Sequence, residues 1–155
     1  MPNFKNVQEL QNYIKTQAKI ALKTQVAQQV KQLLEKYIHM DVYESFTPSY
    51  YERTFQLLNA VKIGEVIETG NVMSINIYIT PEYLGHTTIL GWKKEGLSPN
   101  DPVPVSSVAE WISSGETWGR NEAEFIEHTY QELKERLYHV YGFIGYLKAH
   151  GIIAK

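Results

Sequence analysis

The apolar residues of the first forty positions recur at steps of three and four, which is the spacing of one face of an α-helix. No glycine or proline interrupts them. The pattern predicts one long amphipathic helix over residues 6–38, with Asn6 and Glu9 at the spacing of a capping box. Residues 23–25 are all polar and interrupt this apolar row, so a bend or break of the helix there stays open. Its members are Val7, Leu10, Ile14, Ala18, Ala21, Leu22, Val26, Val30, Leu33, Leu34 and Ile38.

The predicted length of this helix has a consequence for its surroundings. It would measure about 48 Å at roughly 1.5 Å per residue, whereas a compact domain of this size is only about 40 Å across. We therefore expect the helix to extend beyond its own domain and to need a neighbour that covers the rest of its apolar stripe.

A strict two-residue alternation marks the clearest strand. Met73, Ile75, Ile77 and Ile79 alternate with polar residues and Tyr78, after a turn signal at residues 69–71 and a second candidate strand at residues 62–68. One apolar face favours an antiparallel sheet that is covered on one side.

Prolines and glycines break residues 81–119 into a long loop excursion. Within it we expect a strand around residues 87–92 and a short helix around residues 108–112 that Ser106 or Ser107 caps and Gly115 ends. Before the sheet, residues 41–51 read as an aromatic, turn-like loop, followed by a short helix that Thr54 begins.

The closing segment predicts a helix over residues 121–150, with Asn121 and Glu124 at capping-box spacing and Gly151 after the end. Its apolar residues form a seam for another helix or the sheet, while Gly142 and Gly145 lie off that seam and indicate close packing or a bend. The seam residues are Ile126, Tyr130, Leu133, Leu137, Val140, Ile144 and Leu147.

Together these elements predict a single α+β domain over residues 1–155. A long N-terminal helix (6–38) and a C-terminal helix (121–150) pack on a small antiparallel β-sheet, which residues 62–119 supply together with the long loop excursion.

Composition narrows the function. The 155 residues carry a net charge of −2, far from the basic excess of a nucleic-acid binder, so no sequence-specific nucleic-acid partner is expected. The absence of cysteine excludes disulfides and thiolate chemistry. No stretch has the roughly 20 apolar residues of a bilayer span, and the N-terminus lacks the apolar core of a signal peptide, so we expect folding in a cytoplasm.

Candidate chemistry is sparse. Glu124, His128 and Glu132 share a helical face and would offer one imidazole and two carboxylates, but no second helix completes a ligand set, so no metal or cofactor is predicted. No nucleophile or phosphate-loop motif is present, and no catalytic residues are predicted. Two alternatives stay open: a small enzyme whose site lies under the loop at residues 85–118, and a regulatory protein-binding module built on the first helix.

Aromatic residues cluster in two predicted loops, with Tyr43, Phe46, Tyr50 and Tyr51 in one and Trp92, Trp111 and Trp118 in the other. Such residues are favoured in interface hot spots, and they are also suited to cover a hydrophobic core. Both interpretations remain open from the sequence.

The segment P-S-Y-Y-E-R-T-F-Q-L-L-N-A-V at residues 48–61 resembles the Y-x-R-T-G-x-L-L-x-S-I stretch of tailed-phage neck and tail-completion proteins. The order of parts is similar too, with counterparts of a Y-A-x-W-V-E-x-G-T segment at residues 108–117 and of the final helix at residues 125–152. Phe55 stands where that family often has glycine.

The resemblance implies a non-enzymatic structural virion protein of a tailed bacteriophage. It would form a homo-oligomeric ring at the neck or the top of the tail and join the head connector to the tail. Its partners would be other copies of itself and the neighbouring connector and tail proteins, in the host cytoplasm during assembly and then in the virion.

Overall fold

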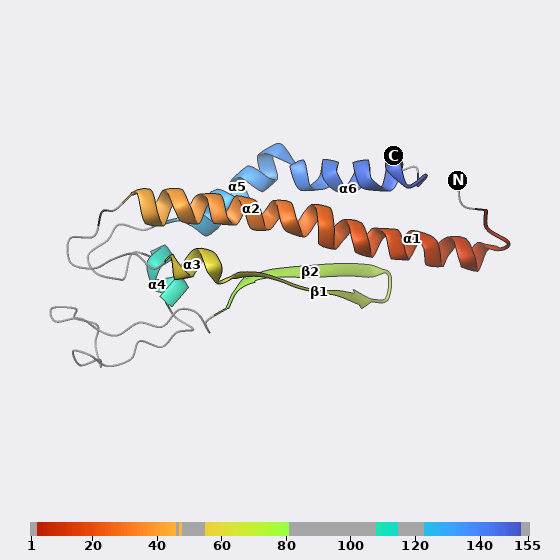
Figure 1. The fold of residues 1–155 in the computed structure, drawn as a ribbon, viewed down its shortest axis with the longest axis horizontal. Helices are drawn as coiled ribbons and strands as arrows, with labels where there is room; N and C mark the ends of the chain where they lie inside the picture. Colours follow the sequence, from red (N-terminus) through yellow and green to blue (C-terminus); the bar gives the residue numbers. More distant parts are fainter. Residues whose placement is uncertain (1–2, 46, 48–54, 81–107, 115–122, 153–155) are drawn as a thin grey trace. The chain divides into compact units, whose positions relative to one another are not determined.

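The computed structural model describes residues 3–45, 47, 55–80, 108–114 and 123–152. Among these the chain is mostly helical with a two-stranded antiparallel sheet, so the predicted α+β class is confirmed (Figure 1). The predicted strand at residues 87–92 and the capping residues Ser106 and Ser107 lie outside the described residues. The elements are α1 (Val7–Ala21), η1 (Leu22–Val26), α2 (Ala27–Tyr37), η2 (Ile38–Glu44), α3 (Gln56–Asn59), β1 (Val61–Thr69), β2 (Val72–Ile79), α4 (Val108–Ser114), α5 (Phe125–Arg136) and α6 (Tyr138–Ala149).

Contacts within the chain divide it into two compact units. One comprises residues 1–32, 63–77 and 131–155, and the other comprises residues 33–62 and 78–130. The single-domain organisation over residues 1–155 stays a prediction.

The N-terminal helix begins as the sequence indicates. The Asn6 Oδ1 accepts a hydrogen bond from the Glu9 N–H at 2.9 Å. The Glu9 carboxylate also reaches back, but to the N–H of Lys5 at 2.9 Å, one residue before the cap. The first interaction satisfies an amide group that the first helical turn leaves without an intrahelical partner, and the second ties the residue before the cap to that turn.

The predicted end of this helix at residue 38 is wrong, because helical structure continues to Glu44 as the π-helical segment η2. The predicted loop therefore does not begin at Asp41. The reason is burial: Ile38, Val42 and Tyr43 are all in the core, so this stretch gains from remaining helical. The sequence left open a bend or a break of the helix at residues 23–25. The chain instead forms the π-helical segment η1 there, and α2 follows directly.

In the first unit, α6 runs alongside α1 and η1 (Figure 1). The Tyr13 hydroxyl donates to the backbone oxygen of His150 at 3.0 Å, and the Tyr146 hydroxyl donates to Gln17 Oε1 at 3.2 Å. The buried Leu147 and Ala21 contribute the apolar part of this unit's interior.

Gly142 marks a close approach between α6 and Gln29. A Cβ at this position would lie 2.7 Å from the Gln29 Nε2, whereas a Cβ at Gly145 would meet nothing within 4 Å. The expectation of close packing therefore holds for Gly142, and both glycines lie inside α6 rather than at a bend.

The hairpin has the predicted alternation. The residues at β2 positions 73, 75, 77 and 79 are half-buried, and their neighbours at 72, 74, 76 and 78 are exposed. Gly70 in the connecting turn has a φ of 61°, a conformation that glycine adopts without the steric cost of a Cβ. At the end of the hairpin opposite the turn, the Thr80 N–H donates a hydrogen bond to the backbone oxygen of Ala60 at 2.8 Å.

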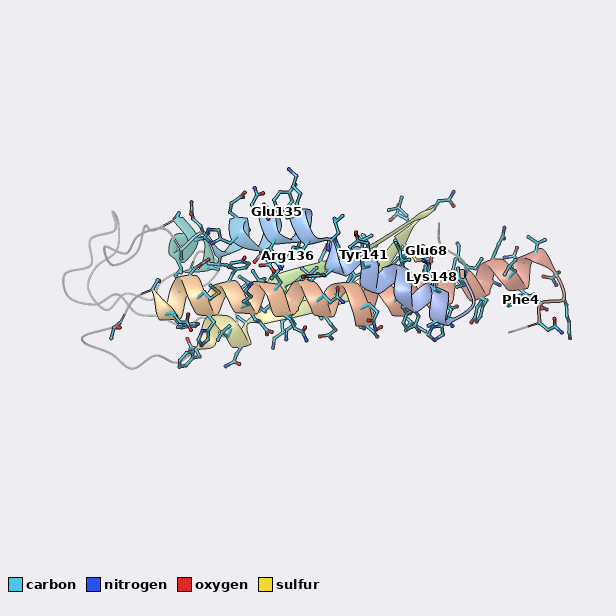
Figure 2. The ribbon with its side chains drawn as sticks, turned by 90° about the horizontal axis from the view of Figure 1, so that it is seen from above. Phe4, Glu68, Glu135, Arg136, Tyr141 and Lys148 are labelled. Carbon is cyan, nitrogen blue, oxygen red and sulfur yellow. The ribbon has the colours of Figure 1, made fainter. Side chains whose placement is uncertain are left out.

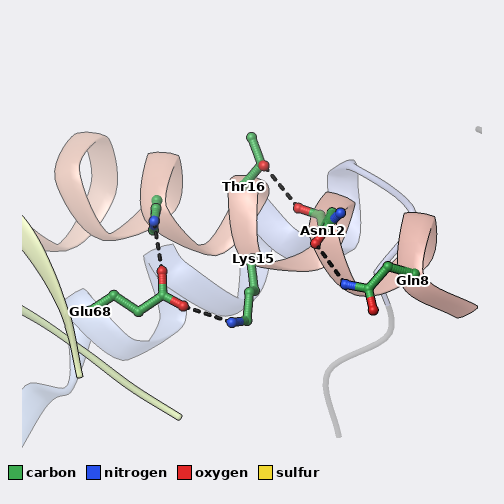
Figure 3. A network of polar contacts seen from close by, with 6 residues as sticks. Gln8, Asn12, Lys15, Thr16 and Glu68 are labelled. Carbon is green, nitrogen blue, oxygen red and sulfur yellow. Dashed lines mark hydrogen bonds and ion pairs between the residues drawn. The ribbon is translucent and has the colours of Figure 1, made fainter. Parts of the chain in front are cut away.

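Three lysines on one face of the N-terminal helix form ion pairs with carboxylates of β1. Figure 3 shows the contact between Lys15 and Glu68. The two oxygens of Glu68 each lie 2.7 Å from an ammonium group, one from Lys15 and the other from Lys19. Glu65 lies 2.9 Å from Lys23. Because the lysines are four residues apart, the contacts fix where the hairpin lies along the helix within this unit.

The second unit has its own apolar core. The Tyr43 ring packs on the Phe55 ring with centroids 4.7 Å apart, and the Ala123 N–H donates to the Ser113 oxygen at 3.2 Å, which ties the start of α5 to α4. Its buried apolar residues are Ile38, Val42, Tyr43, Leu57, Ala60, Val61, Ile112, Ala123 and Phe125.

Phe55 adopts a left-handed conformation, with φ 53° and ψ 24°, immediately before α3. Glycine is the residue that takes this conformation most easily, and the resembling phage segment often has glycine here. The contact between the Phe55 and Tyr43 rings offsets part of the strain. Thr54, the expected cap of α3, lies outside the described residues.

The prediction of one C-terminal helix over residues 121–150 is wrong. Leu137 has a φ of 52° and separates α5 from α6. Glu124, expected inside the first turn, precedes α5 with a φ of 20°, and Asn121 lies outside the described residues. The seam of apolar residues is therefore not straight, because the left-handed residue redirects the chain.

The predicted end at Gly151 is confirmed. The Gly151 N–H donates to the Lys148 oxygen at 3.1 Å, and the Ile152 N–H donates to the Leu147 oxygen at 2.9 Å. With Gly151 at φ 77°, this is the Schellman arrangement that satisfies the last carbonyl groups of α6.

The contacts of Glu68 predict acid sensitivity. Hydrogen bonds from Lys15 and then Lys19 lower the pKa of Glu68 from 4.5 to about 2. Since the folded pKa is the lower one, this contribution to stability is fully present above pH 4.5 and is lost as the pH falls from 4.5 towards 2. In urea melts, Glu68→Gln should be less stable than the wild type at pH 7, and the difference should shrink towards pH 2. A constant difference across this range would contradict the prediction.

The two α6 glycines predict opposite responses to alanine. Gly145→Ala should raise the unfolding free energy by about 1 kcal/mol, because alanine favours the helix and the space is open. Gly142→Ala should gain less or lose stability, because the Gln29 side chain has to move. Equal gains for the two variants in urea melts would show that the Gln29 contact does not constrain α6.

Candidate interaction surfaces

Of the candidate metal-binding cluster Glu124, His128 and Glu132, the structure brings only Glu124 and His128 together. Glu124 Oε2 lies 3.8 Å from His128 Nε2, but Glu132 pairs with Arg136 at 3.8 Å. In the described parts of the chain, no group of three or more His, Asp or Glu side chains is arranged to hold a metal ion. That the protein needs no metal or cofactor stays a prediction.

His128 has a second partner that the sequence did not indicate. Its Nδ1 lies 2.7 Å from Asp41 Oδ2, which η2 presents from a largely buried position, and its ring lies 5.4 Å from that of Tyr37. Both ring nitrogens of His128 thus face carboxylates. The arrangement connects η2 with α5.

The apolar stripe of the first helix is covered unevenly. The exposed fraction is 69% at Val7, 38% at Leu10 and 37% at Ile14, but Ala18 is half-buried and Ala21 is fully buried. Coverage therefore begins beside Tyr13 and Gln17, where α6 contacts α1. The three exposed residues form one stripe, which we call the N-terminal stripe, because they lie three and four positions apart.

Several residues of the predicted C-terminal seam are exposed. Ile126, Tyr130 and Leu137 are exposed and Leu133 is half-buried, although the sequence placed all four on a seam for another helix or the sheet. Only Leu147, at the far end of the seam, is buried. Figure 2 shows side chains of the same region, among them Glu135 on α5 and Tyr141 on α6.

Of the aromatic residues expected in the first loop, Tyr43 covers the hydrophobic core. Tyr43 is buried and stacks on Phe55, so it is not available to another subunit. Phe46, Tyr50 and Tyr51 lie outside the described residues, as do Trp92 and Trp118. The side chain of Trp111 is likewise outside what the structure describes.

Two of these features left no signal in the sequence. Asp41 and His128 are 87 positions apart, so their contact follows only from the fold. The left-handed conformation at Leu137 occurs at a residue type that normally favours helix interiors. The N-terminal stripe, by contrast, was detectable from its periodicity.

No helix among the described residues is long and apolar enough to cross a membrane.

Comparisons with known proteins show one relationship, to a protein family. Neither the curated proteins nor the solved structures gave a match to the chain.

A family match extends over residues 6–149, from the N-cap of α1 to the last residue of α6, and thus over much more than half of the chain. The family is described as YomN, a gene-product name from a Bacillus phage, which indicates a phage-encoded protein. The chain therefore belongs to the YomN family.

Proposed function

We propose that this protein is a structural component of a tailed phage particle, which forms a ring at the neck or the top of the tail and joins the head connector to the tail. It would act without catalysis or a cofactor. Other copies of the chain and the neighbouring connector and tail proteins would be its partners.

The observation that carries this proposal is the N-terminal stripe. Burying Val7, Leu10 and Ile14 against a partner would contribute on the order of 1 kcal/mol for each side chain, in proportion to the apolar area removed from water. A short apolar row with polar flanks is suited to a contact between subunits, since its polar borders keep the free protein soluble.

The family match supports a role in a phage. A phage-encoded chain with the order of parts of neck and tail-completion proteins fits an assembly role. Phe55 is left-handed at the position where the resembling segment often has glycine, the residue that adopts this conformation most easily. Residues 81–107 and 115–122, on which the enzyme alternative depends, lie outside the described residues, and no observation favours that alternative.

The experiment replaces two residues of the N-terminal stripe, Val7→Ser and Leu10→Ser, in one variant. Gln8→Ser and Gln11→Ser form the matched control, because they alter exposed polar residues of the same turns. Both variants spare Tyr13, which holds α6.

We expect both variants to keep the wild-type circular dichroism spectrum and a cooperative melt, since all four side chains are exposed. The stripe variant should fail to form rings in negative-stain images and should not restore infectious particles to a phage that lacks the gene. The control should do both. Normal assembly of the stripe variant would contradict the proposal.

A further inference from the structure

The N-terminal stripe stops where helix α6 begins to cover α1. Val7, Leu10 and Ile14 are exposed at one end of the apolar row of α1. At the other end of the same row, Ala18 is half-buried and Ala21 is fully buried. Helix α6 contacts both α1 and η1 within one compact unit. The exposed and the covered halves are therefore one continuous row, of which α6 covers the C-terminal half.

The exposed half of the row is short for a contact between subunits. From Val7 to Ile14 it runs about 10 Å along the helix axis. Three side chains on two helical turns bury far less than the roughly 800 Å² that each partner contributes to a stable interface. Extending the row to Ala21 doubles its length. A subunit contact on this helix can therefore grow along the row only into the part that α6 covers.

Helix α6 is held on the N-terminal helix mainly by polar contacts. The Tyr13 hydroxyl donates to the backbone oxygen of His150 at 3.0 Å, and the Tyr146 hydroxyl donates to Gln17 Oε1 at 3.2 Å. Among the twelve residues of α6, only Leu147 is buried. Water can replace both hydrogen bonds when the helices separate, so the release of α6 loses little apolar burial.

Two buried polar atoms in these helices are not satisfied. Gln29 Oε1 and His139 Nδ1 are both buried, and neither has a hydrogen-bond partner in the part of the chain that the structure describes. The Gln29 amide lies against Gly142 of α6, with its Nε2 2.7 Å from the place that a Cβ would take, and His139 lies one turn earlier in α6. Separating α6 from Gln29 would give the amide oxygen access to water, which favours release.

The connection between α5 and α6 allows α6 to move as one element. Leu137 separates the two helices with a φ of 52° and a ψ of 23°, a left-handed conformation that is unfavourable for leucine. Hinges are residues at the ends of elements that absorb a change of backbone angles. A return of Leu137 to ordinary angles would redirect α6 and leave its internal hydrogen bonds intact.

We infer that α6 is a removable cover, which masks the C-terminal half of the apolar row of α1 in the free chain and gives way to a neighbouring subunit during assembly. The inference rests on the proposed function and adds the step that regulates the same surface. In the free chain the cover limits association, because only the short N-terminal stripe stays accessible.

Two introduced cysteines can tether α6 to the N-terminal helical run. Gln29→Cys with Gly142→Cys places the only thiols of the chain where the Gln29 amide now meets Gly142. A short bis-methanethiosulfonate reagent joins the two thiols, and dithiothreitol removes it again. Tyr141→Cys with Gly145→Cys is the matched control, because both positions are exposed and the same reagent joins them within α6.

Negative-stain images and sedimentation velocity follow ring formation before and after each treatment. The tethered chain should keep the wild-type circular dichroism spectrum and form no rings until dithiothreitol is added, whereas the treated control should form rings throughout. Rings that form from the tethered chain as readily as from the control would overturn the inference and leave the proposed function standing. An untreated wild-type chain that forms no rings would instead contradict the proposed function, and the inference with it.

Weakening the contact leads to the opposite expectation. Tyr13→Phe with Tyr146→Phe removes both hydrogen bonds and keeps the aromatic side chains. The amide hydrogens of α6 should then exchange faster, and rings should form at a lower protein concentration than for the wild type. Tyr141→Phe changes an exposed tyrosine of the same helix and should alter neither. Faster exchange in α6 with unchanged ring formation would show that the cover does not limit assembly, which would also overturn the inference.

Discussion

The constraint on which this structure depends is that the long N-terminal helical run carries apolar side chains that stay exposed in the part of the chain that the structure describes. Burial along the stripe is complete at Ala21, where α6 packs on the helix, and at Ile38, which lies in the core of the second unit. Towards the N-terminus, cover declines until Val7 is mostly exposed. Because exposed apolar rows are costly in water, the proposed assembly role follows from this imbalance more directly than from any polar site.

Polar contacts in this protein position elements and supply little of the driving force. Exposed ion pairs such as those of Lys15 and Lys19 with Glu68 contribute little to the free energy of folding, because water and salt screen them. Their effect is to set the place of the hairpin on the helix in the first unit. The contact between His128 and Asp41 has the same character in the second unit, where it connects α5 with η2.

Sequence reasoning identified the elements whose signal is local. The periodic stripe, the Asn6 cap, the alternation in β2 and the Gly151 end all depend on residues within a few positions of one another. It missed features that tertiary contacts decide. The helix continues past residue 38 because Val42 and Tyr43 find a core, and the break at Leu137 occurs without glycine or proline. The partner of His128 was likewise undetectable, since Asp41 is remote in sequence.

Because the chain has no cysteine, an introduced cysteine is its single thiol, and labelling at that position of the chain tests the central claim directly. Val7→Cys would report on the N-terminal stripe, and Gln11→Cys on an exposed polar position of the same helix. The rate of thiol labelling is compared between free protein and assembled phage particles. The account predicts rapid labelling of both variants in the free protein and strong protection of the Val7 variant alone in particles. Equal labelling rates at position 7 in free protein and in particles would contradict it.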